Sequence, residues 1–376
     1  MAVMWDVAVV GAGPAGAAAA LGALAAHPGA RVLLLDRAAF PRDKSCGDGV
    51  APHALDVLAG LGVGDLVAGH RPVRRLRLGF ADAEPVAGEM ARPAFVVPRA
   101  VLDARIVAAA VERGAELRRH RVRQVQASVD RVLLDGSVSA RVVVAADGAD
   151  SVVRRQVGVP ATPRDHVAVA IRGYAPVARG REDEQVITFA PGGWPAYAWS
   201  FPVGDGSANV GYGEVLGNGR TSRAHLLARL DELLPAASAG GTAWRAHHLP
   251  LSSGRPRQPD GRVLLAGDAL SLVNPLTGEG IYYAVLSGAL AGRAAVSGAA
   301  DPGAAYRRLL RHELGRHLRH TTLASGLARR RRVVDAGVSA AGRDVGVFDD
   351  LVELGLGRGL LTRRLLLGLG GGLVRG

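Results

Sequence analysis

The residues between positions 11 and 16 have the types and spacing that bind the phosphates of a dinucleotide. Gly11, Gly13 and Gly16 form the pattern G-x-G-x-x-G, with Pro14 and Ala15 ahead of the third glycine. In such a pattern the first glycine permits a tight turn, the second lets backbone approach a pyrophosphate, and the third lets helix and strand pack closely. A helix that begins here also offers free N–H groups to the phosphates. This segment is therefore predicted to bind a dinucleotide.

The elements that position these glycines are predicted to be a strand, a helix and a second strand. Residues 7–10 are apolar, as in a buried parallel strand, and the alanine-rich run after Gly16 favours a helix. Residues 31–35 predict a second strand that ends at Asp36, twenty residues beyond Gly16. An acid at this place accepts ribose hydroxyls, and Arg37 beside it is expected at the same site. The combination favours dinucleotide binding over an ordinary glycine-rich turn.

Two further strand-to-helix junctions carry acids at the ends of apolar segments. Residues 138–146 predict a strand that runs into Asp147, and residues 262–266 predict one that runs into Gly267 and Asp268. Ligands of open α/β sheets bind at such strand ends. The three junctions are expected to converge on one ligand, which must be large, because one nucleotide needs only the first of them.

Two helix starts are expected to face the same ligand. Gly278, Gly280 and Ile281 open a helix that is predicted to continue to about residue 297, and its glycine-rich start offers backbone donors. Arg99 lies at the first turn of a helix predicted through residue 111. Its guanidinium either contacts the cofactor, which we expect, or is simply solvated.

The chain's only lysine and only cysteine, Lys44 and Cys46, lie two residues apart in a loop over residues 40–49. Long loops without regular structure in compact domains are usually functional. A cationic neighbour and backbone N–H groups lower the pKa of a thiol, whereas a buried cysteine beside a solvated lysine is inert. The residues alone leave both interpretations open.

A β-rich region with an unusual concentration of aromatic residues follows residue 160. Segments at 166–174, 184–190, 196–203 and 207–213 alternate as antiparallel strands do. Tyr197, Trp199 and Phe201 alternate along one of them and therefore project from one face. Such a stripe either packs a core or forms the wall of an apolar cavity. Six of the chain's sixteen aromatic residues fall between positions 189 and 212: Phe189, Trp194, Tyr197, Trp199, Phe201 and Tyr212.

Composition argues against a nucleic-acid-binding protein and against a fold held together by disulfide bonds. The chain has 376 residues, enough for two or three lobes, and a net charge of +12 that is carried almost wholly by scattered arginine. No basic stripe with interleaved aromatic residues is present, so no nucleic-acid partner is expected. With one cysteine the chain forms no intramolecular disulfide, which fits a reducing compartment.

The ends of the chain predict where the protein works. The first strand begins near residue 5 and leaves no room for a signal peptide, and no apolar run is long enough to span a membrane. We therefore expect a cytoplasmic protein. Residues 362–370 mix basic and apolar side chains and are expected to contact the inner face of the cell membrane peripherally. The arginines at residues 329–332 are expected on a solvated helix face.

With these features in hand, the chain resembles the flavoproteins of the aromatic-hydroxylase superfamily, through residues 11–16, 146–148 and 267–268. Within that superfamily it is most similar to the geranylgeranyl reductase family. The signature of that family is an aromatic residue, x, Trp, x, Phe, Pro, then seven or eight residues and G-x-G. Residues 197–202 and 211–213 match it without a gap, and the loops at 46–49 and 274–281 are similar too. The resemblance spans residues 6 to about 290 and implies FAD as cofactor, with Asp268 at its ribityl chain.

The family resemblance implies that the protein reduces carbon–carbon double bonds of a polyprenyl chain, either a geranylgeranyl group or the isoprenoid tail of menaquinone. Cys46 is expected beside the flavin, as proton donor or positioning group. Tyr197 and Trp199 are expected to steady positive charge on the substrate. No metal is expected. The expected substrate contacts are Tyr197, Trp199, Phe201, Pro202, Gly211, Tyr212 and Gly213.

Three alternatives remain from the sequence. The main one is an FAD-dependent monooxygenase that hydroxylates or epoxidises a lipid or an aromatic compound. A flavin halogenase needs an active-site lysine, for which only Lys44 is available. A non-catalytic FAD-bound lipid-binding protein would show no turnover with any reductant. The electron donor, whether NAD(P)H, ferredoxin or another reductant, is left open because no second nucleotide-binding pattern is present.

The expected fold class is α/β, with a Rossmann-like FAD-binding domain, a β-sheet substrate domain and a helical C-terminal region. The FAD-binding domain is expected in three pieces, at residues 1–70, 99–160 and 256–300. The substrate domain is expected at residues 71–98 and 161–255, and the helical region at residues 301–376.

Overall fold

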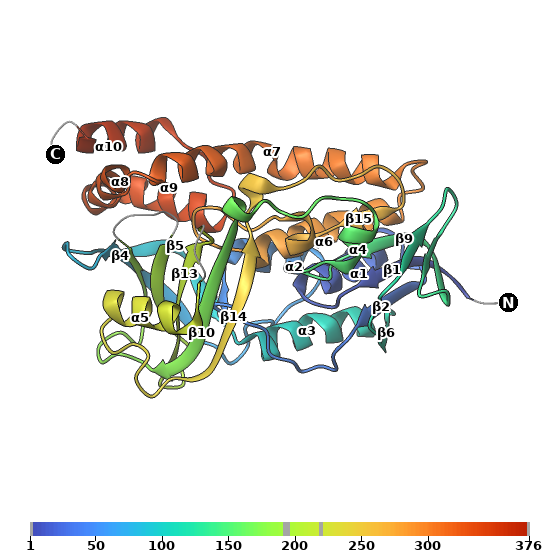
Figure 1. Cartoon of the computed structure of the whole chain (residues 1–376), viewed down its shortest axis with the longest axis horizontal. Coiled ribbons are helices and arrows are strands. Elements are labelled where there is room, and N and C mark those ends of the chain that lie inside the picture. Colours follow the sequence, from blue (N-terminus) through green and yellow to red (C-terminus); the bar gives the residue numbers. More distant parts are fainter. Residues whose placement is uncertain (1–2, 191–195, 218–220, 374–376) are drawn as a thin grey trace.

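The computed structural model describes residues 3–190, 196–217 and 221–373, which form two sheets and a layer of C-terminal helices (Figure 1). The smaller sheet has seven strands in the order β6-β2-β1-β9-β8-β7, with β15 beside β9. Its central strands are largely buried, and most of their residues are valine, leucine or alanine. The strands are β1 (Met4–Val10), β2 (Val32–Asp36), β6 (Glu116–Arg119), β7 (Val125–Ala127), β8 (Val132–Leu134), β9 (Val138–Ala145) and β15 (Val263–Leu265).

Parallel pairing brings the three predicted junctions to one edge of this sheet. β1 pairs in parallel with β2 and with β9, and β9 pairs in parallel with β15. The carboxyl ends of these strands therefore point the same way. They lead into the loops that begin at Gly11, Asp147 and Gly267, and β2 ends at Asp36 itself. The predicted Rossmann-like arrangement is confirmed.

Helix α1 (Pro14–Ala26) is alanine-rich because α6 (Ile281–Ala295) lies directly against its backbone. A methyl group placed on Gly288 would lie 2.0 Å from the carbonyl oxygen of Ala15, and one on Gly292 would lie 1.9 Å from that of Ala19. Backbone contact this close excludes larger side chains. The packing holds the N-termini of both helices at the edge where the strand ends meet.

The larger sheet has eight strands in the order β14-β10-β13-β12-β11-β4-β5-β3. The pairs among β10 to β13 are antiparallel, as predicted, and only β11 and β4 pair in parallel. Residues 49–50, which lie in a segment expected to belong to the nucleotide domain, pair here with the end of β5. The strands are β3 (Gly49–Val50), β4 (Pro72–Phe80), β5 (Val86–Val96), β10 (Val167–Pro176), β11 (Glu184–Phe189), β12 (Ala196–Pro202), β13 (Ser207–Val215) and β14 (Thr242–Pro250).

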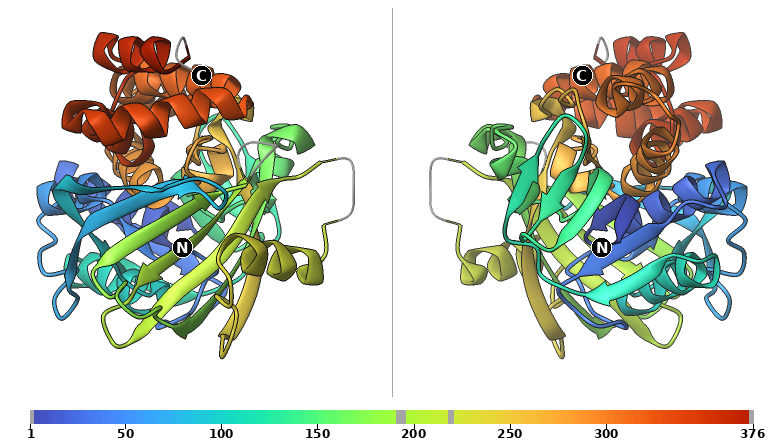
Figure 2. Two further views of the ribbon diagram at one scale, coloured as in Figure 1. Left: turned by 90° about the vertical axis from the view of Figure 1, so that its left-hand side faces the viewer. Right: turned by 90° about the vertical axis from the view of Figure 1, so that its right-hand side faces the viewer.

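The C-terminal helices cover both sheets along one side of the molecule (Figures 1 and 2). The long helix α7 packs against α6 and β15, while α8 and α9 pack against β5 of the larger sheet. This region comprises α7 (Pro302–Ala328), α8 (Arg331–Arg343), α9 (Val345–Leu356) and α10 (Arg363–Leu373). The remaining helices are α2 (Pro52–Gly60), α3 (Arg99–Glu112), α4 (Val152–Gln156) and α5 (Arg223–Leu233), with short 3-10 helices at η1 (Arg164–His166), η2 (Ser252–Gly254) and η3 (Gly267–Leu270).

Three arginines of the run at residues 329–332 are exposed, as expected, but the run does not form one helix face. Arg329 and Arg330 lie between α7 and α8, so the run is divided by a helix break. Arg331 bonds Asp82 through both of its terminal nitrogens, at 2.8 and 2.6 Å, and lies over the ring of Phe80. Part of the run therefore ties α8 to the larger sheet.

Candidate active site

One cavity of about 1200 Å³ connects the glycine-rich loops, the aromatic strand and the C-terminal helices. A pocket for one drug-sized ligand has roughly 300–1,000 Å³, so this cavity has room for a cofactor together with a second molecule. Most of the predicted site residues line it: Gly11, Gly13, Pro14, Ala15, Asp36, Arg37, Cys46, Arg99, Asp147, Tyr197, Trp199, Phe201, Gly213, Asp268, Gly278, Gly280 and Ile281.

Two predicted glycines lie behind the cavity wall instead of lining it. A methyl group on Gly16 would lie 1.7 Å from the carbonyl oxygen of Gly11, so Gly16 sets how closely α1 approaches the turn. Gly267 is buried, and its N–H donates to Ser287 Oγ at 2.9 Å. Both residues act by allowing close packing beneath the ligand-facing loops.

The start of α1 is built to accept phosphate. Gly11 has φ of +94°, and a methyl group there would lie 2.3 Å from the carbonyl oxygen of Ala146. Gly13, the N-cap of α1, provides no side-chain cap, so the first N–H groups of the helix stay available. A methyl group on Gly13 would meet only guanidinium nitrogens, of Arg42 at 3.5 Å and of Arg99 at 3.8 Å. The loop therefore presents backbone donors and two cations to one small space.

The two arginines are held there by a buried carboxylate that the sequence did not reveal. Asp103 is fully buried, accepts bonds from Arg99 at 2.6 and 2.9 Å, and pairs with Arg42 at 3.2 Å. Arg42 also lies 3.7 Å from Asp36. Asp36 accepts from the N–H of Ala12 at 2.8 Å, which fixes the carboxylate against the glycine turn.

The junctions at Asp147 and Asp268 contribute two more carboxylates. Asp147 Oδ2 accepts the N–H groups of Val152 and Val153 at 2.8 and 3.2 Å, while its Oδ1 is buried without a partner among the described residues. Burial raises the pKa of Asp147. A buried oxygen without a partner in the ligand-binding edge is a site for a donor from the ligand.

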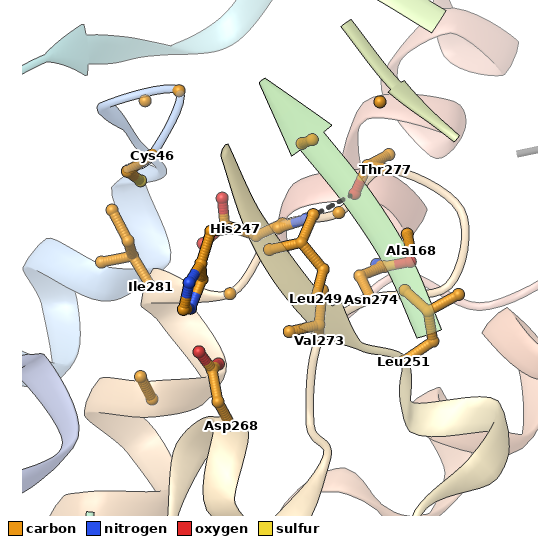
Figure 3. Close-up of a pocket in the computed structure, with 18 of the residues that line it drawn as sticks. Cys46, Ala168, His247, Leu249, Leu251, Asp268, Val273, Asn274, Thr277 and Ile281 are labelled. Atoms are coloured by element: carbon orange, nitrogen blue, oxygen red, sulfur yellow. Dashed lines mark hydrogen bonds between the residues drawn. The ribbon is translucent and has the colours of Figure 1, made fainter. Parts of the chain in front are cut away.

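Lys44 pairs with Asp268, so it is not the cationic neighbour of Cys46 that one of the two open interpretations required. Its Nζ lies 3.4 Å from Asp268 Oδ2. Burial alone would raise the pKa of Asp268, but Lys44 and His247 hold it below its ordinary value. Figure 3 shows His247 between Cys46 and Asp268. Burial, with Lys44 nearby, lowers the pKa of His247 to about 4, so its imidazole is neutral at pH 7.

Burial favours the protonated thiol of Cys46 over the thiolate. Burial raises its pKa, and the opposing effect of the Arg99 guanidinium does not cancel that rise. Of the two roles that the sequence left open, proton donation agrees with this electrostatic setting, because a thiol keeps its proton when its pKa is raised.

The loop over residues 274–280 closes the cavity against the aromatic strand. Tyr197 donates its hydroxyl hydrogen bond to the carbonyl oxygen of Thr277, which ties β12 to this loop. Glu279 accepts from the N–H of Tyr282 at 2.8 Å at the start of α6, and burial raises the pKa of Glu279 to about 7. Asn274 donates to the hydroxyl of Tyr283 at 2.9 Å, so the loop is fixed from within the helical layer.

The paired glycines of the signature make room for its aromatic rings. Gly213 lies opposite Tyr197 and Gly211 lies opposite Trp199 on the neighbouring strand. A methyl group on Gly211 would lie 2.3 Å from the indole of Trp199. The rings of Tyr197 and Trp199 are 5.9 Å apart, and those of Trp199 and Phe201 are 6.4 Å apart, so they form one continuous wall.

The placement of Tyr212 and Pro202 does not support the substrate contact expected of them. Neither residue lines the cavity. Tyr212 points to the opposite face of the sheet, where it packs with the leucines of α5 and donates to Glu214 at 2.8 Å. Gly211 lies beneath the Trp199 ring and also does not line the cavity. Trp194, counted with the aromatic cluster, lies outside the described residues.

Beyond the aromatic wall the cavity continues between the larger sheet and the C-terminal helices. Every residue that α7 to α10 contribute to its lining is apolar or glycine. We call this part the apolar limb, and define it by Val334, Gly337, Val338, Leu351, Val352 and Leu369. The helical region was expected from the sequence but not its part in the site, because apolar residues on amphipathic helices have the pattern of core residues.

Comparison with known proteins agrees with this geometry. Residues 4–291 match the family model described as FAD binding domain. The chain belongs to this FAD-binding family. It is a flavoprotein oxidoreductase, with FAD as its cofactor.

Two relatives and one solved structure extend the match over most of the chain. A menaquinone reductase of Mycolicibacterium smegmatis is 36% identical over 345 residues, 83% of this chain and 81% of that protein. A digeranylgeranylglycerophospholipid reductase of Methanopyrus kandleri is 33% identical over 325 residues, 78% of this chain and 80% of that protein. A geranylgeranyl bacteriochlorophyll reductase-like structure from Thermoplasma acidophilum has a TM-score of 0.80 at 21% identity and covers 100% of this chain and 98% of that chain.

The residues present fit FAD. The uncapped start of α1, with Arg42 and Arg99 beside Gly13, provides the donors and charges for a pyrophosphate. The unpartnered oxygen of Asp147 and the carboxylate of Asp268 lie along the same edge, where hydroxyl groups of the cofactor are the complementary donors. The described residues hold no group of three or more metal-ligating side chains that would suit a metal ion.

Proposed function

We propose that the protein is an FAD-dependent prenyl reductase, which saturates carbon–carbon double bonds of a polyprenyl chain such as a geranylgeranyl group or a menaquinone tail. The observation that carries this proposal is the continuity of the cavity, from the FAD-binding loops past the aromatic wall into the apolar limb. A flexible hydrocarbon chain is the substrate that such a limb complements. The relatives described above, a menaquinone reductase and a digeranylgeranylglycerophospholipid reductase, agree with it.

The residues around the cavity suit reduction of an isolated double bond. Bound and reduced, FAD supplies a hydride. A proton must reach the other carbon, and Cys46 holds one beside the loops that bind the cofactor. Positive charge that builds on the more substituted carbon is met by the faces of Tyr197 and Trp199. The apolar lining excludes water, which would otherwise capture that charge.

The decisive test is an anaerobic single turnover. Enzyme reduced chemically with dithionite is mixed with geranylgeranyl diphosphate, or with a menaquinone already reduced to its quinol so that the ring takes no electrons. The result then does not depend on whether NAD(P)H, ferredoxin or another reductant serves as donor. We expect reoxidised flavin and a product heavier by two hydrogens or a multiple of two. Products that need oxygen and gain one oxygen atom, with no anaerobic reduction, would establish the monooxygenase instead.

We also propose that the protein works at the cytoplasmic face of the cell membrane and docks there through α7 and α10. Both helices lie along the same outer edge of the molecule (Figure 1). Leu323 and Leu327 of α7 are 62% and 42% exposed, and Leu366 and Leu367 of α10 are 48% and 76% exposed. Leu327 also lines the cavity, which places an opening beside this surface.

Charge on this edge suits an anionic bilayer. Within the described residues no ion-pair partner is present for the exposed arginines Arg329, Arg330, Arg332 and Arg363. None of the helices in the described ranges has the length and apolar character to cross a bilayer. Each basic residue near an anionic surface contributes about 1 kcal/mol.

Vesicle flotation tests the docking surface. Exchange of Leu366 and Leu367 for serine should weaken binding to vesicles that contain anionic phospholipid by about tenfold, because two partly exposed leucines lose their apolar burial. Val129, 93% exposed on the hairpin between β7 and β8, offers the matched control Val129→Ser, which should bind as the wild type does. Equal binding by all three proteins would refute the docking surface.

A further inference from the structure

Asn209 uses every hydrogen-bonding group of its side chain to join two parts of the site. It is fully buried on β13, opposite Phe201 of the aromatic strand. Its Nδ2 donates to the carbonyl oxygen of Cys46 at 2.9 Å and to Asp48 Oδ2 at 2.8 Å, and its Oδ1 accepts from Trp199 Nε1 at 2.9 Å. One amide therefore links the cysteine loop to the aromatic wall.

Asp48 anchors this link to the larger sheet. It is fully buried and has φ of +59°, a conformation that aspartate tolerates better than most residues. Its carbonyl oxygen accepts from the N–H of Val97 at 2.9 Å, and Tyr174 of β10 donates its hydroxyl hydrogen bond to Oδ2. The cysteine loop is thus held at Asp48 by β10, by β13 and by Val97, one residue beyond β5.

The loop also lies directly on the indole that Asn209 holds. A methyl group on Gly47 would lie 3.6 Å from Trp199 Nε1 and 3.5 Å from the ring of Phe201. A side chain at position 47 would therefore contact both rings, and a shift of the loop would break its bonds to Asn209. Because Trp199 Nε1 and the Asn209 amide are buried, loss of these bonds without replacement would leave polar groups without partners, which costs free energy.

We propose that Asn209 is a positioning residue, which sets the Cys46 thiol and the Trp199 ring against the same segment of the substrate. This inference rests on the proposed prenyl reduction, because it concerns the proton source and the wall that this reaction uses. It acts through its neighbours, since Asn209 is separated from the cavity by the residues that it holds.

A matched pair of variants tests the proposal. Asn209→Leu removes all three bonds at nearly constant size. Gln258→Leu is the control, because Gln258 is also a buried amide with two donor bonds and one acceptor bond, at 2.9 Å each, and does not line the cavity. Cys46 is the only cysteine, so the rate of labelling by a thiol reagent reports on its loop alone.

With FAD bound, Asn209→Leu should label at Cys46 at least ten times faster than wild type. Its single-turnover rate with geranylgeranyl diphosphate should fall by about a hundredfold, as expected for a displacement of about 1 Å, with KM changed by less than threefold. Gln258→Leu should lose similar thermal stability and change neither value. If Asn209→Leu does not fold, Asn209→Ser, which is too short to reach three partners, carries the same expectation.

Two outcomes would overturn the inference. In the first, the Asn209 variants change the labelling rate of Cys46 and the single-turnover rate no more than Gln258→Leu does. Asn209 would then be a structural residue only. A KM that rises while the single-turnover rate holds would make it a substrate-binding determinant. Failure of the proposed function is a separate result, in which the wild type itself reduces no double bond, and the labelling comparison still decides whether Asn209 holds the loop.

Discussion

The two ends of the cavity are built on opposite principles. At the phosphate end, charged groups hold each other: Asp103 fixes Arg99 and Arg42, and Asp36 is bonded to the glycine turn. In the apolar limb, helices α8 to α10 contribute only apolar residues and glycine. The phosphate end recognises one ligand through directional bonds. The apolar limb selects a ligand by its volume and hydrophobicity. It therefore accepts hydrocarbon chains of different lengths.

This difference means that a substitution should injure one end without the other. Loss of a directional bond or addition of a charge changes affinity for FAD by orders of magnitude. A change of volume in the limb alters which chain fits and by how much, usually about tenfold. The predictions below follow this contrast, from the largest expected effect to the smallest.

Gly13→Asp should abolish FAD binding while the fold persists. The new carboxylate would meet only the nitrogens of Arg42 and Arg99, so it is accommodated, but it places negative charge where the pyrophosphate binds. Like charges in contact cost several kcal/mol, so FAD affinity should fall by more than a hundredfold. Flavin content after purification and the melting temperature check this. A yellow variant with normal flavin would show that phosphate binds elsewhere.

Asp268→Ala should weaken FAD less, by about tenfold to a hundredfold, the cost of one charge-assisted hydrogen bond of roughly 1.5–3 kcal/mol. The change also removes the partner of Lys44, 3.4 Å away. Titration of apoprotein with FAD, followed by fluorescence quenching, measures it. If affinity for FAD stayed the same and turnover of the prenyl chain fell, Asp268 would act on the substrate rather than on FAD, and the contrast between the two ends would be wrong at this residue.

Gly337→Phe should shorten the apolar limb. Gly337 lines the cavity, and a methyl group there would lie 3.4 Å from Leu369, so a ring must project into the free space. We expect KM for geranylgeranyl diphosphate to rise about tenfold, while KM for the shorter geranyl diphosphate and the content of FAD stay constant. Equal effects on both chain lengths would argue against a limb that measures length.

His247→Asn should flatten the acid side of the stability profile by a small amount. The folded protein holds the pKa of His247 near 4, below the ordinary 6.5, so the unfolded chain binds more protons between these values and stability rises with pH there. Between pH 7 and pH 5.5 the free energy of unfolding of the wild type should therefore fall by about 1 kcal/mol more than that of the variant. Urea denaturation at the two pH values measures the difference, and parallel profiles would contradict it.

The phosphate end could be predicted from the sequence because its pattern is local. Gly11, Gly13, Gly16 and Asp36 lie within a single βαβ unit, whose hydrophobic pattern predicts its strands and helix. The parallel pairing then follows from the fold class. The fold class itself and FAD were correctly predicted, whereas the division of the chain into domains stays a prediction.

One error could have been avoided with the sequence alone. The alternation that places Tyr197, Trp199 and Phe201 on one face of β12 also places Tyr212 on the face opposite Gly211 and Gly213. The expectation that every residue of the signature contacts the substrate does not agree with this two-residue alternation along a strand. The glycines serve the rings across the strand, and the tyrosine between them belongs to the core under α5.

Other features had no signal in the sequence, because their partners lie far away along the chain. Asn209 and Cys46 are separated by 163 positions, and Lys44 and Asp268 by 224. Proximity of Lys44 to Cys46 in the sequence was therefore misleading. The apolar limb was missed for a different reason: Val338 or Leu369 has the same pattern whether it faces a core or a cavity.

The close packing of α1 on α6 also has a consequence for how the chain matures. Gly288 and Gly292 of α6 pack closely on the backbone of α1, yet α6 is synthesised only after the whole larger sheet. Until α6 has been synthesised, the apolar, alanine-rich helix α1 has no helix to pack against. Contacts between segments so distant in sequence also form slowly. The cofactor-binding turn is thus among the first parts translated and among the last completed, so we expect FAD to be captured only after residue 295 has emerged.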